Sequence, residues 1–107
     1  MIKVSVEQKN NYIISLKITG HANSAKYGKD LVCAGVSTAG VGAMNMLVKK
    51  GFLVNKLGTI EVSEGYIYVV VNHVDDVCQV VLETLLVTLE TMVENYSQFI
   101  KISKVEV

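Results

Sequence analysis

The chain has 107 residues, of which 50% are apolar, and its ten basic and ten acidic residues give a formal net charge of zero. This length predicts a single domain, residues 1–107, that can bury a hydrophobic core without cross-links. The balanced charge and the lack of a basic tract argue against electrostatic capture of nucleic acid or of an anionic membrane, so neither is expected as a direct partner.

The cysteines and the first residues bear on the cellular compartment. Cys33 and Cys78 are too few for the dense disulfide pattern of a small secreted protein, and the start Met-Ile-Lys lacks the apolar stretch of a secretory signal. These features predict a soluble, cytoplasmic protein. The longest weakly polar stretch, residues 32–48, is interpreted as too short and too rich in Gly, Ser and Thr to cross a bilayer.

Residues 2–19 are predicted to form a β-hairpin. Apolar and polar residues alternate from Ile2 to Glu7 and again from Ile14 to Thr19, which is the period of a strand with one buried face. Turn-forming residues lie between the two segments. Residues 20–30 are predicted to be a loop of small and polar residues, and such loops often carry functional groups.

Residues 31–50 are predicted to form a helix with Asp30 as a plausible N-cap. No charge occurs between Val32 and Val48, and the apolar residues point to all sides of the axis, which is typical of a buried helix. Its three glycines, at positions 35, 40 and 42, each cost about 1 kcal/mol relative to alanine inside a helix. Close approach of a neighbouring element or of a substrate backbone is the usual compensation, and at least at Gly42 we expect packing rather than a part in catalysis.

The C-terminal half predicts a second hairpin, a second helix and a last strand. Residues 59–62 and 66–71 flank the turn Ser63-Glu64-Gly65, and residues 75–96 are predicted to be a helix capped by Asp75 or Asp76. Residues 99–107 are predicted to be an edge or closing strand. On the helix, the inward face is formed by Cys78, Val81, Leu82, Leu85, Leu86, Leu89, Met92, Val93 and Tyr96, and the outward face by Gln79, Glu83, Glu90 and Glu94.

The predicted element order is therefore ββαββαβ. It predicts an α+β fold with a mainly antiparallel sheet. One helix, residues 31–50, is expected to be central and buried, and the other, residues 75–96, to be amphipathic.

Cys33 and His21 are the candidate catalytic residues. The start of a helix favours the thiolate of Cys33 over the thiol, and a histidine at the end of the preceding strand can pair with that thiolate and later give up a proton. Free N–H groups in the first helical turn can hold the oxyanion of a tetrahedral intermediate. Two simpler interpretations stay open, namely that Cys33 is a small buried apolar residue and that His21 caps a turn.

Four further residues are also considered for the site or its surroundings. Asp30 either caps the helix or orients His21, and Ser37, one turn after Cys33 on the same face, either bonds back to a helix carbonyl or touches substrate. Cys78 is expected in the core and His73 at the surface. The spacing of the cysteines and histidines matches no zinc site, so no metal and no cofactor are expected, and the helical glycines do not form a phosphate loop.

Gly20-His21-Ala22, Gly28 and Asp30-x-Val32-Cys33-Ala34-x-Val36-Ser37 together resemble the signature of the ribosomal-processing cysteine proteases, the Prp family. Length and element order are similar over the whole chain. The resemblance implies a cytoplasmic endopeptidase that removes a short N-terminal extension from the large-subunit ribosomal protein L twenty-seven, cutting after an aromatic or hydrophobic residue. It also implies a homodimer, which nothing in this sequence indicates independently.

Carried over to this chain, the resemblance makes Cys33 the nucleophile and His21 the base that later acts as the acid. The supporting or substrate-contacting residues would be Asp30, Ser37, Gly20 and Ala34. The loop 20–30 is expected to order over the bound peptide, and the groove for the residue before the cut to come from Tyr27 or from the region of Met44 and Met46. The competing hypothesis is a non-enzymatic module that binds a peptide or a ribosomal protein.

Overall fold

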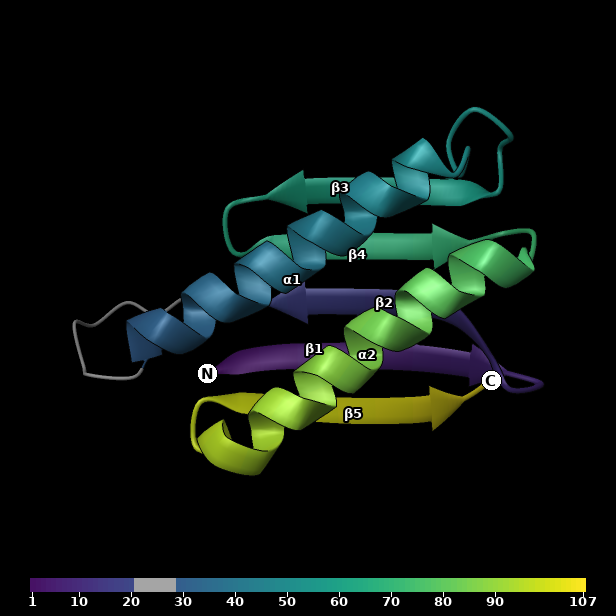
Figure 1. Ribbon diagram of the computed structural model, residues 1–107. Coiled ribbons are helices and arrows are strands. Elements are labelled where there is room, and N and C mark those ends of the chain that lie inside the picture. Colours follow the sequence, from purple (N-terminus) through teal and green to yellow (C-terminus); the bar gives the residue numbers. More distant parts are fainter. Residues whose placement is uncertain (21–28) are drawn as a thin grey trace.

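Five strands form one sheet in the order β3-β4-β2-β1-β5 in the computed structural model, which describes residues 1–20 and 29–107, with side chains from residue 31 onward in the second range (Figure 1). The strands are β1 (Ile2–Lys9), β2 (Tyr12–Thr19), β3 (Gly58–Ser63), β4 (Tyr66–Val71) and β5 (Ile100–Glu106). All neighbouring pairs are antiparallel except β1 and β5, which run parallel. Both predicted hairpins and the mainly antiparallel sheet are confirmed, and the last strand lies at an edge.

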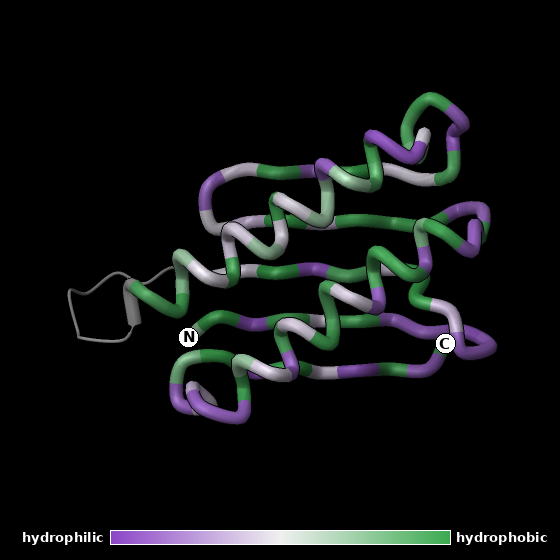
Figure 2. The backbone as a smooth tube through the Cα atoms, in the orientation of Figure 1, coloured by the Kyte–Doolittle hydropathy of each residue, from purple (hydrophilic) through white to green (hydrophobic). Residues whose placement is uncertain are grey.

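The two helices, α1 (Lys29–Lys49) and α2 (Asp76–Tyr96), lie side by side over the same face of the sheet (Figure 1). Their apolar residues meet those of the strands to form the core, and Figure 2 shows how strongly hydrophobic β4 and parts of both helices are. The α+β class and the order ββαββαβ are thus confirmed. The largest fully buried side chains are Phe52, Ile13, Leu16, Leu47, Leu82, Leu89, Ile100, Val4, Val6, Val32 and Val69.

Helix α1 is not the buried central helix that its uncharged sequence predicts. Val32, Val36, Met44 and Leu47 face the sheet, but the opposite side is open, and the side chain of Leu31 is 65% exposed. The prediction was wrong because uncharged residues can also lie at the surface of a protein. The sequence of a helix therefore does not show whether other elements cover all of its sides. The segment Leu31–Lys49 is long enough and apolar enough to cross a membrane, judged by length and composition alone. The prediction that this stretch is too short for a membrane span was therefore wrong.

The glycines of α1 play different parts. A Cβ at Gly40 would lie 2.6 Å from the Cδ1 atom of Ile67, so this glycine allows the helix to approach β4 closely. The same packing was predicted for Gly42, and that prediction was wrong, because Gly42 is exposed and a Cβ there would meet nothing within 4 Å. One glycine therefore allows close packing, while the other only costs helix stability.

Helix α2 has the predicted inward face with one correction. The carboxylate of Asp75 accepts a hydrogen bond from the backbone N–H of Cys78 at 2.9 Å, which confirms Asp75 as the N-cap. Gln79 was assigned to the outward face but is buried, because its amide pairs with the backbone of Ile13, accepting from the N–H at 2.9 Å and donating to the C=O at 2.8 Å. Strand β4 pairs with β2 only from Ser15 to Thr19, so the backbone groups of Ile13, beyond the end of that pairing, are satisfied by a side chain.

Candidate active site

A cavity of about 260 Å³ lies where the first turns of α1 meet one end of the sheet. Its walls come from four places in the chain: the start of β1, the end of β2, the first half of α1 and the turn between β3 and β4. The lining residues are Ile2, Ile18, Gly20, Cys33, Val36, Ser37, Val41, Val62, Ser63, Gly65, Tyr66 and Ile67. Six of the twelve are isoleucine or valine, and a thiol and three hydroxyl groups lie among the rest, so the cavity suits an apolar group next to a polar reacting atom.

Cys33 is the fifth residue of α1, is half-buried, and faces the cavity. Because the Cα–Cβ bonds of a helix tilt toward its N-terminus, the thiol leans toward the end of α1 that carries unpaired N–H groups and partial positive charge. The interpretation of Cys33 as an ordinary buried core residue is therefore wrong. Its sulfur packs against the core on one side and lines the cavity on the other.

Two further predicted site residues share this cavity, and one does not. Ser37 lines it one helical turn after Cys33, as their spacing predicts. Gly20 lines it from the end of β2 with a φ of 121°, and a Cβ there would lie 2.5 Å from the carbonyl oxygen of Met1, so only glycine fits. Ala34 is exposed and does not line the cavity.

His21, Tyr27 and the predicted loop 20–30 lie, for the most part, outside the described residues. Gly20 is the last described residue before this segment, and Lys29 the first after it. Asp30 is the second residue of α1, so the helix begins earlier than predicted and Asp30 lies within its first turn rather than at the N-cap position.

The sequence did not point to the wall formed by the β3–β4 turn. The register of the sheet explains this wall, because β4 pairs with β2 and the backbone N–H of Gly20 donates to the C=O of Gly65 at 3.1 Å. Met44 and Met46, which were expected to form the groove, do not line this cavity: Met44 is buried in the core, and Met46 lies at a separate groove between the two helices. Only knowledge of which strands pair would have placed the turn opposite Cys33.

The second cysteine is unsuited to catalysis, as predicted. Cys78 is 2% exposed in the core. Burial, together with the neighbouring carboxylate of Asp75, raises the pKa of its thiol to about 11, so the thiol stays protonated at neutral pH. His73 is exposed between β4 and α2, which also agrees with the prediction. Within the described part of the chain, no three His, Cys, Asp or Glu side chains are grouped closely enough to hold a metal ion.

Comparison with known proteins places this arrangement among proteases. A sequence model of the family described as cysteine protease Prp matches residues 1–101. The ribosomal processing cysteine protease Prp of Bacillus subtilis is 34% identical over 110 residues, covering 96% of both chains. The crystal structure of the ribosomal processing protease Prp from Staphylococcus aureus with a substrate peptide has a TM-score of 0.81 and 28% identity, covering 97% of this chain and 99% of that one. The same protease with a covalently linked product peptide has a TM-score of 0.79 at 28% identity.

Proposed function

Because the chain belongs to the cysteine protease Prp family, we propose that it removes the N-terminal extension of a large-subunit ribosomal protein by acyl transfer from Cys33, with His21 as the acid–base partner. Its relatives are ribosomal processing cysteine proteases, and it is itself a cysteine protease. The ribosomal protein we propose as substrate is L twenty-seven. A non-enzymatic binding module is disfavoured by membership of a protease family.

The observation that carries the proposal is the position of Cys33, the one cysteine in the wall of the cavity, at the start of a helix and facing apolar side chains. A peptide side chain that enters this cavity meets Ile18, Val36 and Ile67, which favours a hydrophobic or aromatic residue before the scissile bond. Its carbonyl carbon then lies near the sulfur. His21 follows Gly20 by one peptide bond, and Gly20 lines the same cavity.

The proposed reaction proceeds in two half-reactions. His21 takes the proton of the Cys33 thiol, and the sulfur attacks the scissile carbonyl, while N–H groups at the start of α1 hold the resulting oxyanion. The C–N bond then breaks, and the imidazolium gives its proton to the leaving amine. Water, deprotonated by His21, hydrolyses the thioester and restores the thiol. The covalently linked product peptide in the Staphylococcus aureus relative supports such a route.

The test of the proposal is cleavage of a synthetic peptide that spans the extension junction of L twenty-seven, with the products identified by mass spectrometry. We expect a single cut after a hydrophobic or aromatic residue. Pre-treatment with iodoacetamide should alkylate Cys33 and stop cleavage, while Cys78 remains unmodified in the folded protein because it is buried and protonated. Cleavage that survives full alkylation of Cys33 would refute the proposed nucleophile.

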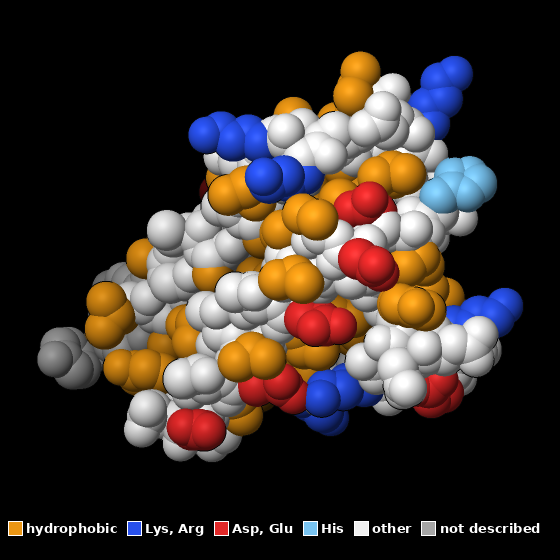
Figure 3. Space-filling model, turned by 45° about the vertical axis from the view of Figure 1, so that its right-hand side comes forward, with side chains coloured by type: hydrophobic (Ala, Val, Ile, Leu, Met, Phe, Trp, Pro, Cys, Tyr) orange, Lys and Arg blue, Asp and Glu red, His pale blue; other side chains and the backbone are white. Residues whose placement is uncertain are grey.

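We further propose that the protein acts in the cytoplasm as a homodimer. The supporting surface is the outer helical surface, which we define as the exposed and half-buried residues along and beside the groove of about 430 Å³ between α1 and α2: Ala39, Ala43, Met46, Val80, Thr84, Val87 and Thr88. None of these residues is charged. Figure 3 shows hydrophobic side chains beside a row of acidic ones on this side of the molecule.

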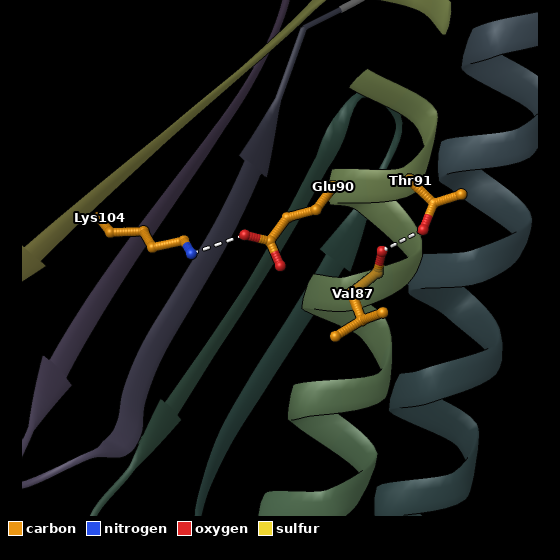
Figure 4. Close-up of polar contacts among 4 residues, drawn as sticks. All are labelled: Val87, Glu90, Thr91 and Lys104. Atoms are coloured by element: carbon orange, nitrogen blue, oxygen red, sulfur yellow. Dashed lines mark hydrogen bonds and ion pairs between the residues drawn. The ribbon is translucent and has the colours of Figure 1, made fainter. Parts of the chain in front are cut away.

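The threonines make the outer helical surface less polar than its sequence indicates. Thr84, Thr88 and Thr91 each donate their hydroxyl proton to the carbonyl four residues earlier in α2, at 2.7–2.8 Å, and Figure 4 shows the bond from Thr91 to Val87. The hydroxyl protons are therefore already bonded within the helix. Beside them, Glu90 pairs with Lys104 of β5 at 2.6 Å, so this acid is already neutralised within the chain (Figure 4). An apolar surface of this kind is typical of an interface.

The dimer is tested by placing a charge on this surface. Val87→Glu should shift the protein from dimer to monomer in sedimentation-velocity experiments, because a carboxylate buried in an apolar interface loses its hydration. Val105→Glu is the matched control, since Val87 and Val105 are 59% and 55% exposed, but Val105 lies on β5 and is not part of the outer helical surface. Equal association of both variants would contradict the proposed interface, and a monomeric wild-type protein would contradict the dimer.

A further inference from the structure

Strand β3 has a free edge beside the cavity. It forms one border of the sheet and pairs only with β4 among the described strands, and Figure 1 shows it as the outermost strand on that side. Ser63 and Tyr66 are paired across the two-residue turn, so their backbone groups bond to each other. Because hydrogen-bonding direction alternates along an antiparallel pair, the N–H and C=O groups of Val62 and Ile60 point away from β4, toward the free edge.

The two edge strands of the sheet, β3 and β5, differ in how many charged residues they carry to prevent a further strand from pairing with them. The opposite edge strand, β5, carries Lys101, Lys104 and Glu106, and charges of this kind discourage a further strand from adding. In β3, Glu61 is the sole charged residue, and there is neither lysine nor proline. Val62 is 50% exposed in spite of being apolar. The edge of β3 is thus open to an extended peptide in a way that the edge of β5 is not.

The open edge leads into the cavity that contains Cys33. Val62 and Ser63 line that cavity together with Cys33 and Ser37. Figure 1 shows the β3–β4 turn at the same end of the sheet as the first turns of α1. A peptide that continues along β3 toward this turn therefore arrives at the thiol.

We propose that the substrate peptide binds as an added strand on the free edge of β3, with the backbone N–H and C=O of Val62 holding the segment next to the scissile bond. This inference rests on the proposed function of Cys33. Side chains of an added strand alternate between the two faces of the sheet, so every second substrate residue points to the helix-covered side, where the apolar cavity lies. The main chain supplies affinity, and the cavity selects one hydrophobic side chain.

The variant Val62→Pro tests the inference, because proline removes only the N–H that points to the free edge and leaves the bonds of β3 to β4 in place. Val62→Ala is the matched control, since it loses a similar part of the side chain but keeps the N–H. We expect the KM for the junction peptide to rise about 3- to 10-fold in Val62→Pro relative to Val62→Ala, with kcat changed less, which is the effect of one lost hydrogen bond. Equal KM values in the two folded variants would overturn the inference.

A second measurement uses the unaltered enzyme and therefore does not depend on the folding of the proline variant. A series of junction peptides, each with one N-methylated backbone amide, should show weaker binding at alternate positions, because only every second N–H of an added strand faces its neighbour. Binding that is insensitive to the position of the methyl group would overturn the inference. In both experiments the wild-type enzyme must first cleave the unmodified peptide, so a failure of the proposed function is recognised separately.

Discussion

Replacing Cys33 by serine is expected to lower the rate of peptide cleavage by about 10⁴-fold or more while peptide binding stays within a few-fold of the wild type. A serine hydroxyl is a much weaker nucleophile than a thiolate, and the start of a helix cannot ionise it at neutral pH. The change alters packing only slightly, because the two side chains differ by one atom and residue 33 is only half-buried. Single-turnover cleavage followed by mass spectrometry gives the rate, and fluorescence anisotropy with a labelled junction peptide gives the binding.

Cys78→Ala is the control for this experiment. It removes the other thiol, which lies in the core away from the cavity, and should leave the cleavage rate nearly unchanged while lowering the free energy of unfolding by about 1 kcal/mol. If Cys33→Ser cleaves at a rate near that of the wild type, the cysteine in the cavity is not the nucleophile. Loss of binding together with cleavage would assign Cys33 to peptide recognition instead.

Replacing His21 by alanine is expected to reduce kcat/KM by about 10²- to 10⁴-fold, the range of a single acid–base residue. The same variant should slow alkylation of Cys33 by iodoacetamide at neutral pH, because the thiolate loses its imidazolium partner. A residue that only shapes the loop would not change the alkylation rate in the absence of peptide. The two rates, measured on one preparation, therefore separate a catalytic part for His21 from a structural one.

His73→Ala serves as the matched control, because His73 is the other histidine of the chain, is exposed, and lies between β4 and α2. We expect its cleavage and alkylation rates to equal those of the wild type. Unchanged cleavage in His21→Ala would refute the assigned base, and reduced cleavage in His73→Ala would show that the acid–base partner was chosen wrongly.

The local sequence determined most of the secondary structure. Alternation of apolar and polar residues located both hairpins and the last strand, and the helical period with an acidic cap located α2. Cys33 and Ser37 were also placed on one helical face from their spacing alone, and both line the cavity. These features depend on residues close together in the chain, so the sequence pattern records them directly.

The tertiary structure alone decided what surrounds Cys33 and which faces stay exposed. The cavity wall at Gly65 and Tyr66 exists because β4 pairs with β2, and the open edge beside it exists because β3 has no outer neighbour among the described strands. The exposed side of α1 and the burial of Gln79 follow likewise from contacts between distant segments. The spacing of apolar residues along the chain shows which side of a helix or strand is apolar. Which other element packs against that side is decided by contacts between distant segments, and these contacts leave no periodic pattern in the sequence.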